Sequence, residues 1–196
     1  RPAAPKERPG SERGIANPPG RRRRGSETTG MKVIDTIKQN CRRCYTCVRD
    51  CPTKAIKIEE GQASVVPERC IACGNCTRVC SQNAKTYVSG LEDVNGFIQD
   101  GEPVAALVAP SFPAEFTEEQ TEDVVGAFKG VGFDWVVEVA YGADLVSEAY
   151  REFLSDAEGR SWIATACPAV VEYVRKYHPA LVDRLVPVVS PMVATA

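Results

Sequence analysis

The sequence predicts an α+β domain followed by an incomplete α/β domain with a parallel sheet, and three observations lead to this fold class. Eight of the nine cysteines lie between Cys41 and Cys80, as expected of a small domain built around its cysteines. Apolar segments alternate with helical patterns from residue 104 onward, as in parallel sheets with helical crossovers. The first 30 residues, with five prolines and five glycines, match neither pattern.

Residues 1–30 are predicted to form a disordered basic tail. They carry eight basic and three acidic side chains and too little apolar surface to offset the entropy lost on ordering. The run Arg21–Arg24 leaves a functional basic arm open, but an export signal is excluded because no apolar stretch follows it. Met31 opens the first patterned segment, so a translation start there, without residues 1–30, is the other interpretation. The rest of the chain is net −7, which argues against a nucleic-acid partner.

Two cysteine runs share one spacing. CRRCYTCVRDC begins at Cys41, CIACGNCTRVC begins at Cys70, and both read C-x-x-C-x-x-C-x-x-x-C. This spacing suits two 4Fe-4S cubes, in which the last cysteine of each run binds the cube of the other run. The first predicted ligand set is Cys41, Cys44, Cys47 and Cys80, and the second is Cys70, Cys73, Cys76 and Cys51. Zinc is less favoured because its structural sites usually use two separated pairs, and a disulfide framework because no signal peptide precedes the cysteines.

The segment between the runs, AIKIEEGQASVV, alternates like a β-hairpin that turns around Glu59, Glu60 and Gly61. The side chains expected to cover the clusters are Ile56, Ile58, Val65 and Val66. With the cysteine runs, this segment resembles the bacterial two-cluster ferredoxin, and the domain is expected to span residues 31–89. The resemblance implies an α+β ferredoxin-like domain with two [4Fe-4S] clusters, one-electron transfer, and a redox protein partner such as a ferredoxin or a reductase. Residues 38–54, net +4, allow docking of an acidic partner or stabilisation of a reduced cluster, and solvated surface charge is the simpler interpretation.

Residues 90–196 are predicted to belong to the α/β domain. Buried strands are expected at residues 104–109, 135–140 and 162–166, with helices at residues 117–131 and 142–157. This alternation predicts a parallel sheet covered on both faces, with functional groups just past the carboxyl ends of its strands. The segments at those positions are Pro110–Ser111, Tyr141–Gly142 and Cys167–Pro168.

Cys167 ends the third expected strand and precedes a helix that begins at Pro168. The amino terminus of a helix favours a thiolate and therefore metal ligation. A buried structural cysteine is the alternative that the local sequence leaves open. His178, the only histidine, precedes Pro179 at a predicted helix end, so a structural or surface role is expected for it.

Five segments in order resemble the start of an iron-only hydrogenase large subunit, with the sensory branch as the nearest match: VIDTIKQNCRRCYTCVRDCP, ALVAPSFPAEF, VVEVAYGADL, TACPAVVEYVRKYHPAL and VVSPMVATA. The resemblance runs from Met31 to Ala196 and makes Cys167 a ligand of the 4Fe-4S half of the six-iron H-cluster. It also implies four residues that approach the two-iron half: Pro110, Ser111, Ser190 and Met192. The other H-cluster cysteines are missing from this sequence, so an H-cluster is expected only if the chain continues beyond Ala196.

Two departures from this family bear on activity. Ala166 stands where catalytic members usually carry a proton-relaying cysteine, and Pro113 stands in the region where an arginine is common. They imply a slow or hydrogen-sensing protein that passes electrons through its two clusters to or from an H-cluster domain, with a downstream sensory or output domain. No residue is assigned as catalytic, and whether the protein is an enzyme stays open.

The alternative function is a ferredoxin-type electron carrier or binding module whose α/β domain is non-catalytic. No apolar run approaches the ~20 residues of a membrane-spanning helix, so no membrane partner and a cytoplasmic location are expected.

Overall fold

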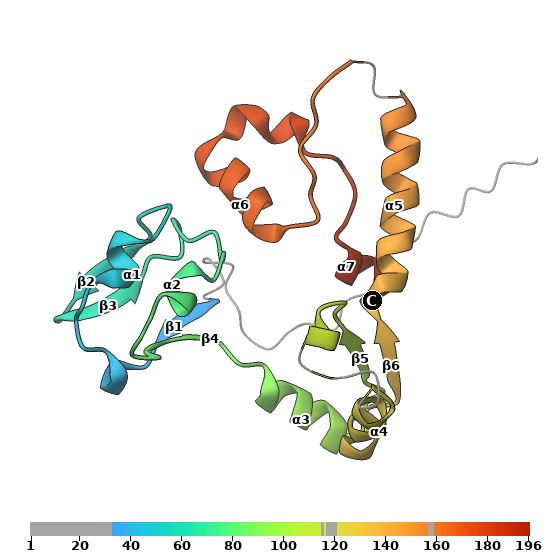
Figure 1. The fold of residues 1–196 in the computed structure, drawn as a ribbon, viewed down its shortest axis with the longest axis horizontal. Helices are drawn as coiled ribbons and strands as arrows, with labels where there is room; N and C mark the ends of the chain where they lie inside the picture. Colours follow the sequence, from blue (N-terminus) through green and yellow to red (C-terminus); the bar gives the residue numbers. More distant parts are fainter. Residues whose placement is uncertain (1–32, 115, 117–120, 157–158) are drawn as a thin grey trace, which may run out of the picture.

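A computed structural model describes residues 33–114, 116, 121–156 and 159–196, so the predictions for residues 1–30 and Met31 lie outside the described residues. The fold is a mixed α/β arrangement with small sheets (Figure 1). The cysteine-bearing elements gather at one side of the molecule and β5, β6 and α5 at the other, with α6 between them. The elements of the cysteine-rich part are β1 (Ile34–Thr36), η1 (Lys38–Asn40), α1 (Thr46–Arg49), β2 (Ile56–Glu59), β3 (Gln62–Val65), α2 (Asn75–Arg78) and β4 (Lys85–Tyr87).

Two antiparallel pairs hold the cysteine-rich part together. β1 pairs with β4, with Ile34 opposite Tyr87, and β2 pairs with β3, with Ile56 opposite Val65. The hairpin predicted here is confirmed. Glu60 and Gly61 at its tip have φ values of 49° and 72°, the left-handed pair that a two-residue turn needs to match strand twist.

The core of this part is small and includes cysteines. Its buried members are Ile34, Cys47, Cys51, Ala55, Ile56, Ala63 and Val65. Ile56 and Val65, two of the four side chains expected to cover the clusters, lie in this core, and Val66 is half-buried. Side chains alternate along a strand, so Ile58 lies on the same face of β2 as Ile56, and it borders the space around Cys41 and Cys47 although it is 39% exposed.

The second part begins after β4. Its elements are α3 (Leu91–Gln99), β5 (Ala105–Val108), η2 (Phe112–Ala114), α4 (Thr121–Val131), β6 (Trp135–Glu138), α5 (Val139–Asp156), α6 (Pro168–Tyr177), η4 (Pro179–Arg184) and α7 (Pro191–Thr195). β5 and β6 form a parallel pair, Ala105 opposite Trp135 and Val108 opposite Glu138, with α4 in the crossover between them. The expected strand–helix–strand unit is present there, and the part of the predicted 117–131 helix before Thr121 lies outside the described residues.

The strand predicted at 135–140 is too long. β6 ends at Glu138, and Tyr141 and Gly142, expected just past a strand end, lie inside α5. Val139, Gly142 and Val146 are buried and lie on one side of α5. This spacing is that of a helix packed on a neighbouring element, and it explains why the chain is helical here instead of continuing as a strand.

The strand predicted at 162–166 is reduced to a single parallel bridge between Ile163 and Leu185. Side chains hold this segment instead of a strand ladder: Trp162 packs edge-on against Phe153, and the Thr165 hydroxyl bonds to carbonyls of the 186–188 segment. The expectation of a sheet covered on both faces is also not met among the described residues, since Trp135 in β6 is 56% exposed.

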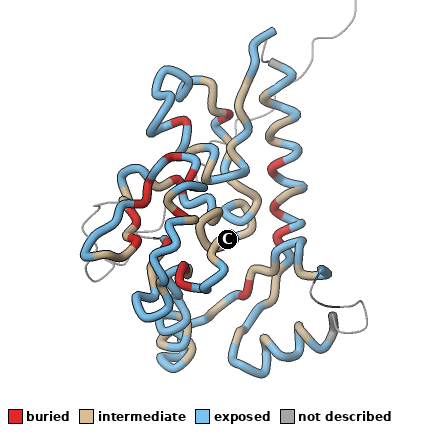
Figure 2. The backbone as a smooth tube through the Cα atoms, turned by 60° about the vertical axis from the view of Figure 1, so that its left-hand side comes forward, coloured by how far each residue is buried: buried red, intermediate tan, exposed pale blue. Residues whose placement is uncertain are grey.

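The helices after this segment agree with the sequence. α6 begins at Pro168 with Cys167 as its N-cap residue, and α7 begins after Ser190, whose hydroxyl accepts a hydrogen bond from Val193 N. Figure 2 shows many of the buried segments in the cysteine-rich part, whereas buried and exposed residues alternate along α5. Within the described residues, no helix combines the length and the apolar character that crossing a bilayer requires.

Candidate metal centres

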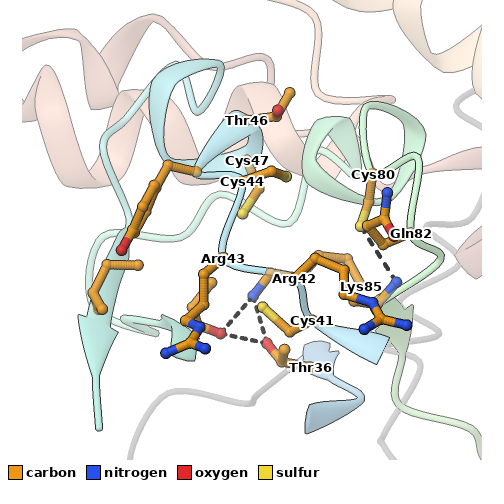
Figure 3. A pocket seen from close by; sticks show the side chains of 14 residues that line it. Thr36, Cys41, Arg42, Arg43, Cys44, Thr46, Cys47, Cys80, Gln82 and Lys85 are labelled. Atoms are coloured by element: carbon orange, nitrogen blue, oxygen red, sulfur yellow. Dashed lines mark hydrogen bonds between the residues drawn. The ribbon is translucent and has the colours of Figure 1, made fainter. Parts of the chain in front are cut away.

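The first predicted ligand set surrounds one cavity. Its four thiols line a space of about 400 Å³, mouth included, together with Thr36, Ala63 and Lys85. The four are Cys41, Cys44, Cys47 and Cys80. Cys41 and Cys44 come from the loop that leads into α1, Cys47 lies in α1 itself, and Cys80 comes from the end of the second run (Figure 3).

The second predicted set surrounds another cavity, of about 340 Å³. Its four thiols are Cys51, Cys70, Cys73 and Cys76. The other lining residues are mostly apolar and include Ile34, Ile56 and Ile71. Each cavity is therefore lined by three thiols of one run and the last thiol of the other.

The backbone of the two runs has the same unusual conformation at equivalent places. Residues 29 positions apart pair as Arg43 with Ala72, Tyr45 with Gly74, and Lys54 with Asn83, and all have φ between 47° and 73°. Left-handed residues next to right-handed ones direct successive N–H groups to one side, forming a concave site for an anion. At Gly74 an added Cβ would lie 2.5 Å from Tyr87 Oη, which explains why glycine stands there.

Backbone N–H groups also point at cysteine sulfurs. Ala55 N lies 3.2 Å from Cys51 Sγ and Ala84 N lies 3.3 Å from Cys80 Sγ, again at positions 29 apart. Ala72 N lies 3.4 Å from Cys70 Sγ. Such N–H···S hydrogen bonds stabilise thiolates and raise the potential of an iron–sulfur centre. Four thiols per cavity with N–H donors behind them fit the donor set of a 4Fe-4S cube.

The thiols differ in how readily they ionise, according to their burial. Burial raises the pKa of the Cys47 thiol and raises the pKa of Cys76 to about 11, and in both cases the charge of Lys85 acts against the rise. Hydrogen bonds from Thr46 lower the pKa of Cys44. Exposed Cys44 thus favours its thiolate, whereas the buried thiols need a positive counter-charge to become thiolates.

The thiols do not converge on a point. No three His, Cys, Asp or Glu side chains of the described residues lie close enough to hold a single metal ion. A cube differs from a zinc ion in this respect, since each thiolate binds a different iron corner and the four sulfurs stand around the cluster. Four thiols spread around each cavity are compatible with a cube.

Helix α6 joins the second cavity to the rest of the molecule. Lys176 Nζ donates to Cys70 O (2.7 Å) and Pro67 O (3.1 Å). Tyr177 Oη donates to Arg69 O (2.9 Å) and Thr53 O (3.3 Å). The last turn of α6 is therefore held on the loop that carries Cys70, while Cys167 stands at the other end of the same helix, about 15 Å away at 1.5 Å per residue.

Cys167 is exposed, so the alternative of a buried structural cysteine is wrong. Its neighbours Ala166 and Pro168 line a cavity of about 1860 Å³, mouth included. Three of the residues expected near the two-iron site, Pro110, Ser190 and Met192, line the same cavity, and Ser111 is exposed next to Pro110. Thr165 brings the segments together by donating toward Val188 O (2.6 Å) and Val186 O (3.0 Å). Among the described residues Cys167 is the one thiol beside this cavity, so these residues alone do not complete the donor set of a cube.

His178 lies at the end of α6, exposed, with Nε2 3.1 Å from Tyr173 Oη, in agreement with a surface role. The sequence reasoning missed three residues, Lys85, Lys176 and Tyr177. An alignment of the two runs, extended to the residues that follow them, would have indicated Lys85, because it occupies the position equivalent to Ile56. Lys176 and Tyr177 carry no local signal, since their acceptors are backbone carbonyls more than 100 residues away.

Comparisons with known proteins match two separate parts of the chain. Residues 32–81 match the family model of a 4Fe-4S dicluster domain, and residues 102–196 match that of the iron only hydrogenase large subunit, C-terminal domain. The chain is 36% identical over 59 residues to a subunit of the ion-translocating oxidoreductase complex of Methanosarcina acetivorans. It is 40% identical over 48 residues to the polyferredoxin-like subunit of the aliphatic sulfonate oxidoreductase of Pyrococcus furiosus.

These matches cover 30% and 22% of this chain, and 22% and 28% of the two relatives. The chain thus spans less than a third of the length of the curated relatives it matches. The family matches extend over the cysteine cavities at one side and over Cys167 and its cavity at the other. By these matches, residues 32–81 are similar to a 4Fe-4S dicluster domain and residues 102–196 are similar to the C-terminal domain of the iron-only hydrogenase large subunit.

Proposed function

We propose that this chain is the N-terminal part of an iron-only hydrogenase-like large subunit of the low-turnover, sensory kind. An α+β ferredoxin-like domain, residues 31–89, passes electrons through two 4Fe-4S clusters to or from an incomplete α/β domain, residues 90–196. The observation that carries the proposal is the division of eight thiols into two cavities of four, each drawn from both runs. Iron–sulfur clusters held in this way supply reversible one-electron transfer.

The contacts between the two parts support a route for electron transfer between them. Cys51 belongs to the first run but borders the second cavity, so the two sites share a short stretch of backbone. From the second cavity, the contacts of Lys176 with the Cys70 loop lead into α6, and Cys167 begins that helix. The second cluster would then be the one next to Cys167, and the first would exchange electrons with a redox protein partner.

The lining of the Cys167 cavity supports slow turnover. Ala166 borders the cavity beside Pro110 and Met192, and its methyl group cannot carry a proton to or from a reacting centre. Because the remaining H-cluster ligands are not among these residues, Cys167 would supply one thiolate of a cluster completed by other sequence.

Iron and sulfide analysis tests the cluster assignment. We expect about eight irons per chain, and about four after either Cys76→Ala or Cys47→Ala. The interlocked ligand sets make a sharper prediction: Cys51→Ala must leave the same residual cluster, by electron paramagnetic resonance, as Cys76→Ala, and Cys80→Ala the same as Cys47→Ala. Ser81→Ala, next to Cys80 but outside the cavity lining, is the control and must keep eight irons.

Zinc in place of iron, or residual spectra that group Cys51→Ala with Cys47→Ala, would contradict the assignment. The alternative function, a ferredoxin-type carrier with a non-catalytic α/β domain, requires the same two clusters. It differs in needing no third metal site at Cys167.

A further inference from the structure

The two halves of the cysteine-rich part differ at one buried position. Ala55 and Ala84 occupy equivalent places and donate equivalent N–H···S hydrogen bonds, to Cys51 and Cys80. The next residue is Ile56 in the first half and Lys85 in the second, and both are buried, 7% and 6% exposed. A cation therefore stands where the repeat otherwise has an aliphatic core side chain.

These two side chains also face equivalent spaces. Ile56 lines the second cavity, with Cys51, Cys70 and Cys76. Lys85 lines the first cavity, with Cys41, Cys44, Cys47 and Cys80 (Figure 3). The first site thus has a positive charge at the place where the second site has a hydrocarbon.

The hydrogen bonds of Lys85 fix its ammonium group without neutralising it. Nζ donates to Thr36 Oγ1 (2.5 Å) and to Ala63 O (3.0 Å), and the Thr36 hydroxyl itself donates to Ala63 O (2.6 Å). Both acceptors are uncharged. A buried ammonium is costly unless a negative charge lies near it, and a cube with four thiolates is such a charge.

We propose that Lys85 is a positioning residue that raises the reduction potential of the first 4Fe-4S cluster above that of the second. The inference rests on the proposed function, because it needs both clusters. One electron added to the first site makes it more negative by one charge, with no bond formed or broken, and the adjacent cation stabilises that added charge. The second cavity, with Ile56 at the equivalent position, lacks this stabilisation at close range.

The charge of Lys85 influences thiols of both sets, but the side chain lines only the first of the two cavities. Its charge opposes the rise in pKa at Cys47 and at Cys76. Because Lys85 lines the first cavity and not the second, removing its charge should have a large effect at the first cluster and a smaller effect at the second. A higher reduction potential at the first cluster would favour electron transfer from the second cluster to the first. Electrons that arrive from the Cys167 side would then move toward the redox partner.

The experiment is a redox titration with dithionite, followed by electron paramagnetic resonance, of the full chain with its clusters. Lys85→Gln keeps a hydrogen-bond donor and removes the charge. We expect it to lower the midpoint potential of the first cluster by at least the equivalent of a tenfold change in equilibrium constant, about 59 mV for one electron, and the second by less. Lys85→Arg retains the charge and should leave the first potential within half of that shift.

Lys57→Gln is the matched control. Lys57 follows Ile56, loses the same unit of charge on substitution, and is exposed and paired with Glu59 at 2.7 Å, so its removal should leave both potentials in place. Cysteine variants that lose one cluster assign each potential to its cavity.

An unchanged first potential in Lys85→Gln, an equal shift in Lys57→Gln, or an equal drop in Lys85→Arg would overturn the proposal. If Lys85→Gln does not hold both clusters, Lys85→Met, which resembles the apolar side chain of Ile56, replaces it under the same criteria. Wild-type protein without two clusters would instead overturn the proposed function itself, so the two failures are distinguishable by iron content.

Discussion

At the scale of single residues, Gly142 shows how close contact decides identity. A Cβ added to Gly142 would lie 2.2 Å from both Pro191 O and Thr195 Oγ1. Helices α5 and α7 can therefore approach each other closely only because glycine has no side chain at this position. Gly126 in α4 has open space around it: its Cβ would meet nothing within 4 Å. The two glycines lie inside helices and differ only in their surroundings.

We predict that Gly142→Ala lowers the free energy of unfolding by about 1–3 kcal/mol, because a buried helix contact must open to admit the methyl group. Gly126→Ala should instead raise it by about 0.5–1 kcal/mol, through helix propensity alone. Thermal unfolding followed by circular dichroism measures both. A stabilised Gly142→Ala would show that α7 does not pack on α5.

At the scale of elements, α6 acts as a connection between two sites. Its amino terminus carries Cys167, and its last turn is held on the Cys70 loop by Lys176 and Tyr177. Every acceptor there is a backbone carbonyl, so the contacts depend on the loop conformation rather than on the loop side chains.

We predict that Lys176→Met with Tyr177→Phe increases hydrogen–deuterium exchange in residues 67–72 and in the last turn of α6. Hydrogen bonds from charged donors contribute about 1.5–3 kcal/mol and neutral ones about 0.5–1.5 kcal/mol, and partial exposure of Lys176 places its share at the low end. Arg175→Met, one residue earlier and in an exposed pair 3.8 Å from Glu172, is the control with little expected effect. Unchanged exchange in the double variant would mean that α6 is held by other contacts.

At the scale of the whole molecule, the chain combines one part with a complete set of thiols and another part with one thiol beside a larger cavity, among the residues that the structure describes. Hydrogen chemistry is therefore a property to test on the complete gene product, made together with the proteins that assemble the H-cluster. We predict slow hydrogen oxidation or evolution, and a gain in rate of at least about tenfold for Ala166→Cys, because a thiol can relay the proton that alanine cannot.

A gas-chromatographic hydrogen assay measures this rate, and an H-cluster signal in the infrared spectrum shows that the centre is present. A protein with two cubes, no H-cluster signal and no hydrogen turnover would support the electron-carrier alternative. A high rate without any substitution would contradict the low-turnover proposal.

The sequence by itself determined much of the metal chemistry, because thiol spacing is a local property. Two runs with the same spacing predicted the grouping found around the two cavities, and Pro168 predicted the start of α6 beside Cys167. Its expectations of strands failed at residues 139–140, which begin α5, and at residues 162–166, where side-chain hydrogen bonds from Thr165 replace a strand ladder.

Only the tertiary structure decided which charges and helices reach the sites. Alignment of the two runs places Lys85 at the position equivalent to Ile56, but only folding buries its ammonium group against Thr36 and Ala63 beside the first cavity. Lys176 and Tyr177 likewise meet their acceptors across more than 100 residues of chain. Local spacing can predict what a loop binds, but the potential of a bound cluster depends on fields and contacts that form when distant segments come together.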